Sequence, residues 1–325
     1  MPDSPRLPDY KAFSIHHPAS LKPLRQGAVY ALVRGLMVVA GRLSLARLQA
    51  LGRLLGRLVY RLSERQRRLC HLQLAMALPE LSKAERVHIA RRSLENQGMT
   101  LLETMALPRL RRTGAPWLRL EGAECFSGAH ARGRGVVLVT AHAANWELLP
   151  IALERLRIRA LAVASTLTNP RLNEIVSAIR RFEYMDVAER GSETSPRQLL
   201  SCLKRGDALV LVNDVDIEAQ GVFVDFFGIP ANTPRAPASL ALKLDAPVVT
   251  YFDTREPDGT HVLRFQEVPV TEAIRVSADP VRALTQAITA QAEAHIRAHP
   301  DQWVWNHRRW KRRPPGETNG ATSTG

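Results

Sequence analysis

Short apolar runs alternate with amphipathic stretches through the second two thirds of the chain. Runs rich in β-branched residues, typical of strands, lie at 136–140, 160–165, 208–213, 247–252 and 261–266, with a shorter one near 185–187. Helical patterns lie between and after them, near 145–157, 170–182, 196–205, 235–244 and 279–299. This alternation predicts an α/β fold with a mixed, mostly parallel sheet covered by helices. We place this α/β body at residues 108–314.

The segment 22–107 has a different pattern, which predicts basic helices. Leucines at 48, 51, 55, 58 and 62 recur at steps of three and four and form one apolar stripe, while arginines at 53, 57 and 61 form a separate ridge. From Lys22 to Arg68 there are eleven Lys or Arg residues and one acid. A basic amphipathic helix of this kind suits a membrane-associated anchor. The alternative is that the leucines pack on the protein's own core. The pair Gly52 and Gly56 receives no interpretation, because glycines at this spacing indicate helix association only within an apolar membrane span.

Other signals set the remaining boundaries. Ser82 to Glu85 form a capping box that predicts a helix up to about Ala106, in which Glu103 needs no functional role. Residues 1–21 form a polar, proline-punctuated extension without the features of a secretory signal, and residues 315–325 are expected to be a disordered tail. The apolar stretch from Gln26 is too short, and too closely followed by arginines, to span a membrane.

Charge and cysteine content restrict the function classes. The net charge of +14 and the pI of about 10.6 predict an anionic partner: nucleic acid, an anionic membrane, or an acidic protein or lipid. The three cysteines are far apart, so they form neither a metal pattern nor a disulfide framework. We therefore expect no metal and a reducing compartment.

The strongest candidate chemistry follows the first predicted strand of the body, in the stretch TAHAANWELLP. Residues five apart lie about 140° from one another on an ideal helix, so His142 and Glu147 cannot share a helix face. If His142 lies in the turn and a helix begins near Asn145, Glu147 can reach back to the imidazole. A carboxylate on one ring nitrogen leaves the other free to accept a proton. A packed turn with two incidental polar groups is the structural alternative.

Two further observations bear on the chemistry. Asp214 and Asp216 follow another predicted strand, and the carboxyl ends of such strands are where ligands usually bind. No serine or cysteine accompanies the His142–Glu147 pair, so the nucleophile is expected to be the substrate's own hydroxyl.

The residues His142 to Glu147 resemble the His-x4-Asp/Glu block of the lysophospholipid acyltransferase superfamily. They are closer still to the His-x-x-Asn-Trp-Glu form of the bacterial lipid A late acyltransferases, the lauroyl and myristoyl transferases. The resemblance covers about residues 27–314 and includes blocks at 74–86, 214–228 and 302–311. It implies a glycerolipid acyltransferase-like fold and the transfer of an acyl chain from a thioester to a lipid hydroxyl.

The resemblance also implies residue roles. His142 is the general base, oriented and charged by Glu147, and the oxyanion donors are backbone amides or Asn145. Arg190 stands where the family places an arginine that binds anionic substrate; a solvated loop arginine is the alternative. Asp214 and Asp216 match the family's Asp-x-Asp on the acceptor side, although Asn213 and Val215 replace its usual Pro and Gln, and Asp216 can instead cap the next turn.

The closing stretch QWVWNHRRWKRR mixes tryptophans with basic residues. Such a mixture can bind single-stranded nucleic acid or face a membrane and acidic lipid headgroups. Because no nucleic-acid-binding module accompanies it, we expect no nucleic-acid partner.

We interpret the chain as a peripheral or monotopic inner-membrane acyltransferase on the cytoplasmic face. It acts on a lipid A precursor or related glycolipid, without a cofactor, using acyl carrier protein or coenzyme A as the donor carrier. Its expected partners are anionic membrane lipid, the glycolipid acceptor and acidic acyl carrier protein. The alternatives are a family member that acylates another lipid, such as a lysophospholipid, and a non-catalytic lipid-binding protein.

Overall fold

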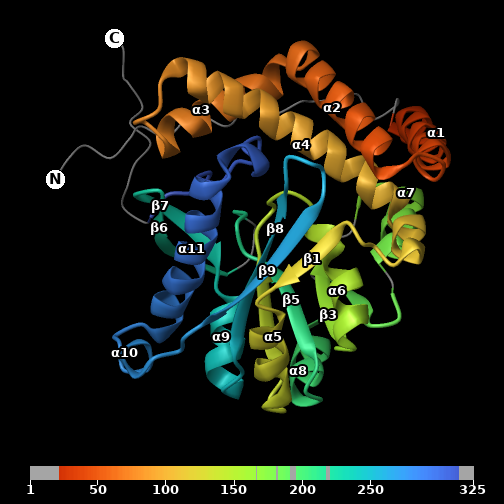
Figure 1. Cartoon of the computed structure of the whole chain (residues 1–325). Coiled ribbons are helices and arrows are strands. Elements are labelled where there is room, and N and C mark those ends of the chain that lie inside the picture. Colours follow the sequence, from red (N-terminus) through yellow and green to blue (C-terminus); the bar gives the residue numbers. More distant parts are fainter. Residues whose placement is uncertain (1–21, 166, 181, 191–194, 217–219, 315–325) are drawn as a thin grey trace, which may run out of the picture.

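A computed structural model of the chain describes residues 22–165, 167–180, 182–190, 195–216 and 220–314 (Figure 1). The predicted polar extension, 1–21, and the predicted tail, 315–325, lie outside the described residues. Four helices come first along the chain: α1 (Lys22–Ala40), α2 (Leu45–Leu62), α3 (Glu64–Ala77) and α4 (Lys83–Leu110). The capping box of α4 is confirmed, and the helix continues past the predicted end at Ala106 to Leu110, with Pro108 inside it.

The body contains a seven-stranded sheet. Its strands are β1 (Leu118–Glu121), β2 (Val136–Thr140), β3 (Ala160–Ala164), β4 (Met185–Glu189), β5 (Ala208–Val212), β8 (Val248–Arg255) and β9 (His261–Val268). They lie in the order β1-β9-β8-β2-β5-β3-β4, and every neighbouring pair is parallel except β8 and β9. The prediction of a mixed, mostly parallel sheet is therefore confirmed. The short strand β1 and a separate hairpin, β6 (Gly221–Phe226) with β7 (Ile229–Pro234), were not predicted.

Helices cover both faces of this sheet. They are α5 (Ala123–Ala131), α6 (Leu149–Leu156), α7 (Pro170–Arg180), α8 (Ser195–Lys204), α9 (Ala236–Leu244), α10 (Glu272–Arg275) and α11 (Pro280–Ala298). Alternate residues of β2 are buried on opposite faces. Val136 and Leu138 belong to the core shared with α5 and α6, whereas Val137 and Val139 pack with α8, α9 and α11. Because both faces are covered, this strand is apolar throughout rather than alternating.

The helices α1 to α4 form a layer across the top of the sheet in Figure 1. Helices α2 and α4 meet through three glycines. A Cβ atom on Gly52 would lie 2.5 Å from the Met99 Cα, one on Gly56 would lie 2.2 Å from the Leu94 carbonyl oxygen, and one on Gly98 would lie 2.2 Å from the Gly52 carbonyl oxygen. The Gly52-x-x-x-Gly56 pair thus marks a close helix contact inside the protein.

The leucine stripe of α2 serves two purposes. Leu48 is fully buried against α1 and α4, and Leu51 and Leu55 pack at the edge of that core. Leu58 and Leu62 are exposed, at 49% and 75% of their surface. Packing on the protein's own core therefore accounts for the first part of the stripe. Within the described residues, no helix combines the length and apolarity needed to cross a membrane.

The aromatic residues of the closing stretch lie in the core. Trp303, Trp305 and Trp310 are fully buried and contact Phe226 and Phe227 of the β6–β7 hairpin. Burial excludes these tryptophans from a surface that faces a membrane or lipid headgroups, because a mixture of aromatic and basic residues does not by itself reveal which side chains are buried. Arg309 is also buried and donates hydrogen bonds to the Asn232 carbonyl and the Thr233 hydroxyl.

The glycine contact predicts opposite effects for two Gly→Ala substitutions in helices. Gly98→Ala forces a methyl group against the backbone of α2 and should lower the free energy of unfolding by about 1–3 kcal/mol. Gly128→Ala in α5, where no atom lies within 4 Å of the added Cβ, should raise it by up to about 1 kcal/mol. Urea unfolding followed by circular dichroism measures both, and equal effects would contradict the close packing of α2 on α4.

Candidate active site

The parallel pairing of β2 and β5 brings His142 and Asp214 together. Thr140 and Val212, the last residues of the two strands, are register partners. His142 and Asp214 each lie two residues beyond these ends, so they meet at the carboxyl edge of the sheet. The imidazole Nδ1 of His142 lies 2.8 Å from Asp214 Oδ1. The His142 backbone N–H donates to Asp214 Oδ2 at 2.7 Å, and so fixes the backbone of the turn as well as the ring.

Asp214 is almost fully buried, with 1% of its side chain exposed. Its Oδ2 also accepts a hydrogen bond from Trp303 Nε1 at 2.7 Å. Burial alone would raise the pKa of Asp214, but the charge of His142 and the hydrogen bonds from His142 and Trp303 outweigh burial and hold the pKa below its usual range. The ionised carboxylate can only accept, so the neutral form of His142 carries its proton on Nδ1 and presents a lone pair on Nε2.

Two aromatic rings enclose the imidazole of His142. The Trp146 ring lies 4.7 Å away and the His307 ring 4.9 Å away, both edge to face. Burial first, and the charge of His142 second, lower the pKa of His307 to about 4, so the second histidine is neutral at pH 7. Because the rings of Trp146 and His307 that lie against His142 carry no charge, Asp214 is the anionic group that contacts the imidazole.

Glu147 does not contact the imidazole, so its predicted role in orienting His142 is wrong. It lies in the short 3-10 helix Trp146–Leu148, and both of its carboxylate oxygens accept hydrogen bonds from Arg180 at the end of α7. The Arg180 Nε lies 3.0 and 2.9 Å from the two oxygens. Burial lowers the pKa of Arg180, but the contact with Glu147 outweighs it and raises the pKa overall. The turn directs Glu147 toward α7 instead of back to the ring.

Asn145 is fully buried and uses its donors internally. Its backbone N–H donates to Asp253 at 2.8 Å, and its side-chain amide donates to Glu103 at 3.0 Å. Its side-chain oxygen accepts from the Glu147 N–H at 3.3 Å, which makes it the cap of the 3-10 helix. Asn145 is not among the residues that line the two cavities described below, so this geometry does not support its predicted role as an oxyanion donor.

The remaining predicted site residues, Arg190 and Asp216, lie in different parts of the structure. Arg190 follows β4 and lines the same cavity as His142, and burial lowers the pKa of its guanidinium. Asp216 lies away from the cavity, with none of its side chain exposed, and accepts from Asn232 and Arg312. These partners join β7 to the C-terminal segment through Asp216 and do not support its predicted contact with substrate.

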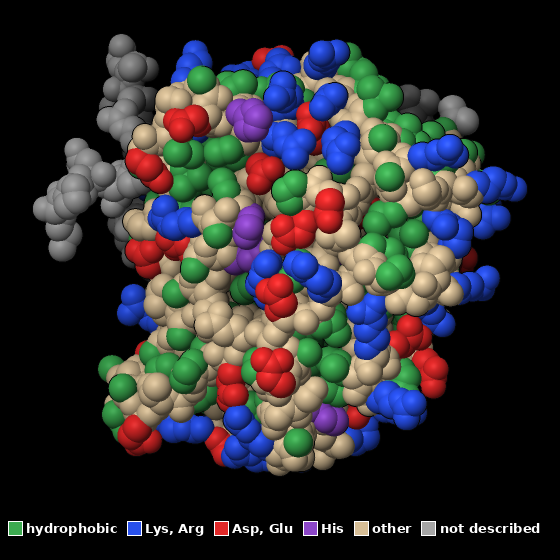
Figure 2. All heavy atoms as spheres, viewed as in Figure 1, with side chains coloured by type: hydrophobic (Ala, Val, Ile, Leu, Met, Phe, Trp, Pro, Cys, Tyr) green, Lys and Arg blue, Asp and Glu red, His purple; other side chains and the backbone are tan. Residues whose placement is uncertain are grey.

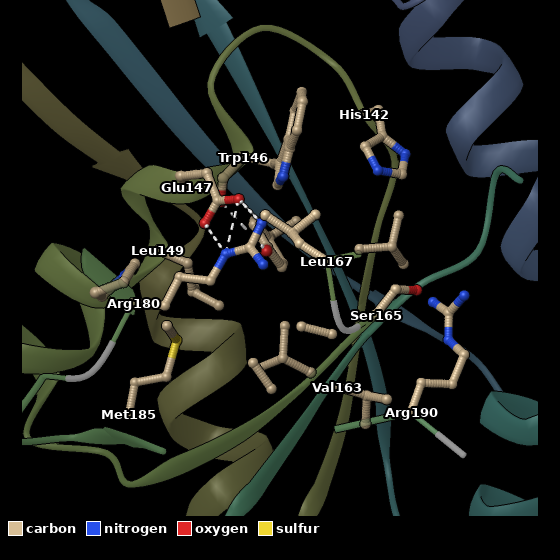
Figure 3. Close-up of a pocket in the computed structure, with 16 residues that line it drawn as sticks. His142, Trp146, Glu147, Leu149, Val163, Ser165, Leu167, Arg180, Met185 and Arg190 are labelled. Carbon is tan, nitrogen blue, oxygen red and sulfur yellow. Dashed lines mark hydrogen bonds and ion pairs between the residues drawn. The ribbon is translucent and has the colours of Figure 1, made fainter. Parts of the chain in front are cut away.

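Two cavities meet at His142. One, of about 250 Å³, lies at the carboxyl ends of β3 and β5 and includes Ser165 and Arg190 (Figure 3). The other, of about 620 Å³, lies between α2, α4, α7 and residues 304–307. Four residues line both cavities: His142, Trp146, Glu147 and Arg180. Figure 3 shows the Glu147–Arg180 pair and Arg190 on opposite sides of the first cavity.

Sequence reasoning missed Arg180 and did not assign roles to Trp303 or His307. Arg180 lies 33 residues from Glu147 and shares no spacing with it that a sequence pattern reveals. Trp303 and His307 stood in a stretch whose burial was not evident. Among the described residues, no cluster of three His, Cys, Asp or Glu side chains has the geometry to hold a metal ion.

Comparisons with known proteins identify related acyltransferases. The model of the bacterial lipid A biosynthesis acyltransferases matches residues 16–312. The chain is 27% identical to the lipid A biosynthesis lauroyltransferase of Escherichia coli, over 81% of this chain and 84% of that protein. It is 30% identical to the phosphatidylinositol mannoside acyltransferase of Mycobacterium tuberculosis, over 67% and 69%. It is 25% identical to the lipid A biosynthesis palmitoleoyltransferase of E. coli, over 83% and 86%.

The family match spans nearly all of the residues that the structure describes, including the strand ends that carry His142 and Asp214. The chain therefore belongs to the bacterial lipid A biosynthesis acyltransferase family and is an O-acyltransferase.

Proposed function

We propose that this enzyme moves an acyl chain from an acyl thioester to a hydroxyl of a lipid A precursor or a related glycolipid, with His142 as the general base. One observation carries the proposal: a histidine with a free Nε2, held by a buried carboxylate, lies where two cavities meet. Such a position suits a base that must reach a hydroxyl from one side and a thioester from the other.

The proton and electron movements follow from this geometry. His142 Nε2 removes the proton as the acceptor hydroxyl oxygen attacks the thioester carbonyl carbon. Asp214, on Nδ1, stabilises the imidazolium that forms. When the tetrahedral intermediate collapses, the carbon–sulfur bond breaks and the imidazolium returns the proton to the leaving thiolate. Positioned base catalysis of this kind is worth about 10²–10⁴ in rate.

Arg180 is our candidate for stabilising the oxyanion. Its guanidinium lines both cavities and is fixed by the two oxygens of Glu147. A fixed positive charge near the developing oxyanion stabilises the transition state, and one such donor is commonly worth about 10²–10³ in rate. In this proposal Glu147 contributes by positioning Arg180, not by orienting His142.

The linings of the cavities suggest how the substrates divide between them. The larger cavity has apolar walls from Leu55, Val59, Leu101, Val176 and Ile179, which suit an acyl chain. The smaller cavity has Arg190 and Ser165, which suit the polar or anionic headgroup of the acceptor. Acyl carrier protein is our proposed donor carrier, because an acidic protein complements a chain of net charge +14.

The acceptor has a second candidate. The mycobacterial relatives are phosphatidylinositol mannoside acyltransferases, and one of them is 30% identical to this chain. A phosphorylated or mannosylated glycolipid other than lipid A therefore fits the same site. Mass spectrometry of membrane lipids from cells with and without the protein identifies the acceptor and the added acyl mass together.

The outer face of α1 and α2 supports our proposal of binding at the cytoplasmic face of the inner membrane. Leu54, Leu58 and Leu62, four residues apart on α2, are exposed, as are Leu32 and Val38 on α1. Figure 2 shows Lys and Arg side chains among apolar ones over these helices. Exposed leucines flanked by arginines can enter the headgroup region of an anionic leaflet.

Removal of the base should abolish transfer without unfolding the protein. We expect His142→Ala to lower kcat by about 10²–10⁴. Asp214→Asn should lower it by about 10³–10⁴, because an asparagine amide can donate to Nδ1 and select the wrong tautomer. The assay is thiol release from lauroyl-coenzyme A or lauroyl acyl carrier protein, with a lipid A precursor or a phosphatidylinositol mannoside as acceptor. Full activity of His142→Ala would exclude the dyad; no transfer by the wild type to any lipid would favour the non-catalytic lipid-binding protein.

Membrane binding should depend on the exposed leucines of α2. Leu58→Ser with Leu62→Ser should weaken binding to vesicles containing anionic phospholipid by about 10²-fold, because each leucine removed from water contributes about 1.5 kcal/mol and each 1.4 kcal/mol is a factor of ten in affinity. Val276→Ser is the matched control, since Val276 is 72% exposed near α10, against 75% for Leu62. Vesicle co-sedimentation at low and high salt separates the apolar contribution from the electrostatic one. Equal binding by both variants would contradict an α2 docking face.

A further inference from the structure

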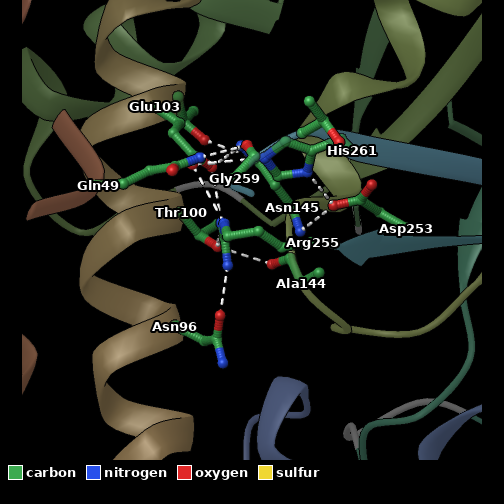
Figure 4. A network of polar contacts seen from close by, with 12 residues as sticks. Gln49, Asn96, Thr100, Glu103, Ala144, Asn145, Asp253, Arg255, Gly259 and His261 are labelled. Carbon is green, nitrogen blue, oxygen red and sulfur yellow. Dashed lines mark hydrogen bonds and ion pairs between the residues drawn. The ribbon is translucent and has the colours of Figure 1, made fainter. Parts of the chain in front are cut away.

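A fully buried cluster of charged residues lies beneath the turn that follows His142 (Figure 4). Glu103 of α4, with 1% of its side chain exposed, accepts hydrogen bonds from Arg255, Asn145 and Gln49. Asp253 of β8 accepts from His261 Nδ1 at 2.7 Å and from the Asn145 N–H at 2.8 Å. The other imidazole nitrogen of His261, Nε2, lies 3.4 Å from Glu103. Two carboxylates, one guanidinium and one imidazolium together form a neutral buried set.

The cluster reaches the backbone of the turn at the Asn145 N–H, through Asp253, and at the Ala144 carbonyl, through Thr100. Ala144 adopts a left-handed conformation, with φ of 43°, which an alanine rarely adopts without support. Its carbonyl accepts from the Thr100 hydroxyl at 2.7 Å, and Thr100 in turn accepts from Arg255 at 3.2 Å. Its N–H donates to the Gln302 carbonyl at 2.8 Å, and Gln302 is bound to the backbone of Arg255.

These contacts act on residues 144 and 145, whereas Asp214 binds His142 itself. The turn of residues 143–145 joins the end of β2 to the 3-10 helix that carries Glu147, so its position sets both His142 and the Glu147–Arg180 pair. Helix α4 also supplies Leu94, Gly98 and Leu101 to the wall of the larger cavity. The same helix thus links the wall of that cavity to the turn.

We infer that Glu103, Asp253, Arg255 and His261 are positioning residues for the acyl transfer, which hold the 143–145 turn so that His142 faces the junction of the two cavities. The inference rests on the proposed role of His142 as the base. None of the four side chains lines either cavity. They act through Asn145 and Ala144 and do not touch substrate. The earlier interpretation of Glu103 as a residue without a functional role is thereby replaced.

The test compares two buried glutamates of the same helix. Glu103→Gln removes the negative charge beneath the turn. Glu95→Gln removes one from a side chain that is likewise fully buried and that binds Arg57 and Arg92, away from the turn. Because a displacement of about 1 Å can cost 10²-fold in rate, we expect Glu103→Gln to lower kcat by about 10²-fold with little change in the KM for lauroyl-coenzyme A, and Glu95→Gln to lie within about threefold of the wild type.

The position of His142 has its own readout. The proton shared between His142 Nδ1 and Asp214 should give a downfield proton resonance in the wild type and in Glu95→Gln, and should lose it or shift it in Glu103→Gln. This resonance reports the position of the ring even if His142→Ala retains transfer, so failure of the positioning role and failure of the proposed base are separable. An unchanged resonance in Glu103→Gln would overturn the inference, and so would a loss of activity in this variant that comes from a higher KM and not from a lower kcat.

A gentler variant covers the case in which Glu103→Gln fails to fold. Thr100→Val keeps the side-chain shape but removes the donor to the Ala144 carbonyl, and we expect a fall in kcat of about tenfold, equivalent to one lost hydrogen bond of about 1.4 kcal/mol. Thr100→Ser keeps the hydroxyl and should recover most of the loss. Equal activity of the valine and serine variants would argue against a positioned turn.

His261 gives the cluster a distinctive dependence of stability on pH. It faces Asp253 and Glu103, beside Arg255 and the edge of the Trp117 ring. Burial lowers its pKa, but the two carboxylates outweigh burial and raise it to about 9. A raised folded-state pKa stabilises fully below the unfolded value near 6.5, and that stabilisation is lost as pH rises through about 9. The loss between pH 7 and 10 should be smaller in His261→Gln by denaturant unfolding; an identical loss would show that His261 is not charged in the folded protein.

Discussion

The carboxylate of Asp214 joins three parts of the chain that are far apart in sequence. It receives the ring and the backbone N–H of His142, which follows β2, and the indole N–H of Trp303 from the C-terminal segment. Its own position is fixed by β5, whose parallel register with β2 sets the two strand ends at one level. Removing a carboxylate from water costs several kcal/mol, which only strong, well-aligned partners offset. Asp214 has three such partners, so the buried charge specifies how the sheet, the turn and the C-terminal segment fit together.

A second set of buried charges contacts the turn that follows His142. The negative charges of Glu103 and Asp253 lie against the basic side chains of Arg255 and His261. Both carboxylates accept hydrogen bonds from Asn145, and Arg255 reaches the Ala144 carbonyl through Thr100. Residues 142–145 are therefore held by two separate sets of ionic groups, which cannot shift without losing partners. Such rigidity matters for a base whose substrate is not covalently held by the protein, because the rate depends on the orientation of the reacting groups. The close glycine contact of α2 and α4 keeps Glu103 of α4 close to Gln49 of α2, which donates to Glu103 and to the Gly259 carbonyl.

The sequence was sufficient for the architecture and for part of the site. Apolar strands alternating with amphipathic helices predicted the sheet, and the strand ends predicted where His142 and Asp214 lie, because these patterns depend on local periodicity. The pairing of His142 with Asp214 depends on the parallel register of β2 with β5, which no local pattern encodes. The contact between Glu147 and Arg180 likewise joins residues 33 apart. The buried tryptophans near residue 305 have the same composition as an exposed aromatic and basic patch, so only tertiary packing distinguishes the two.

In the proposed mechanism, the pairing of Glu147 with Arg180 explains how His142 can act as a base with both Asp214 and Glu147 nearby. An imidazole has two nitrogens, and Asp214 already occupies Nδ1. A second carboxylate on the ring would take Nε2, and no lone pair would then remain for the substrate hydroxyl. Glu147 can therefore assist His142 only by acting on a different group. Glu147 instead fixes Arg180 at the junction of the cavities. In the proposed mechanism this places a positive charge beside His142 without competing for its ring, and proton removal and oxyanion stabilisation fall to separate residues.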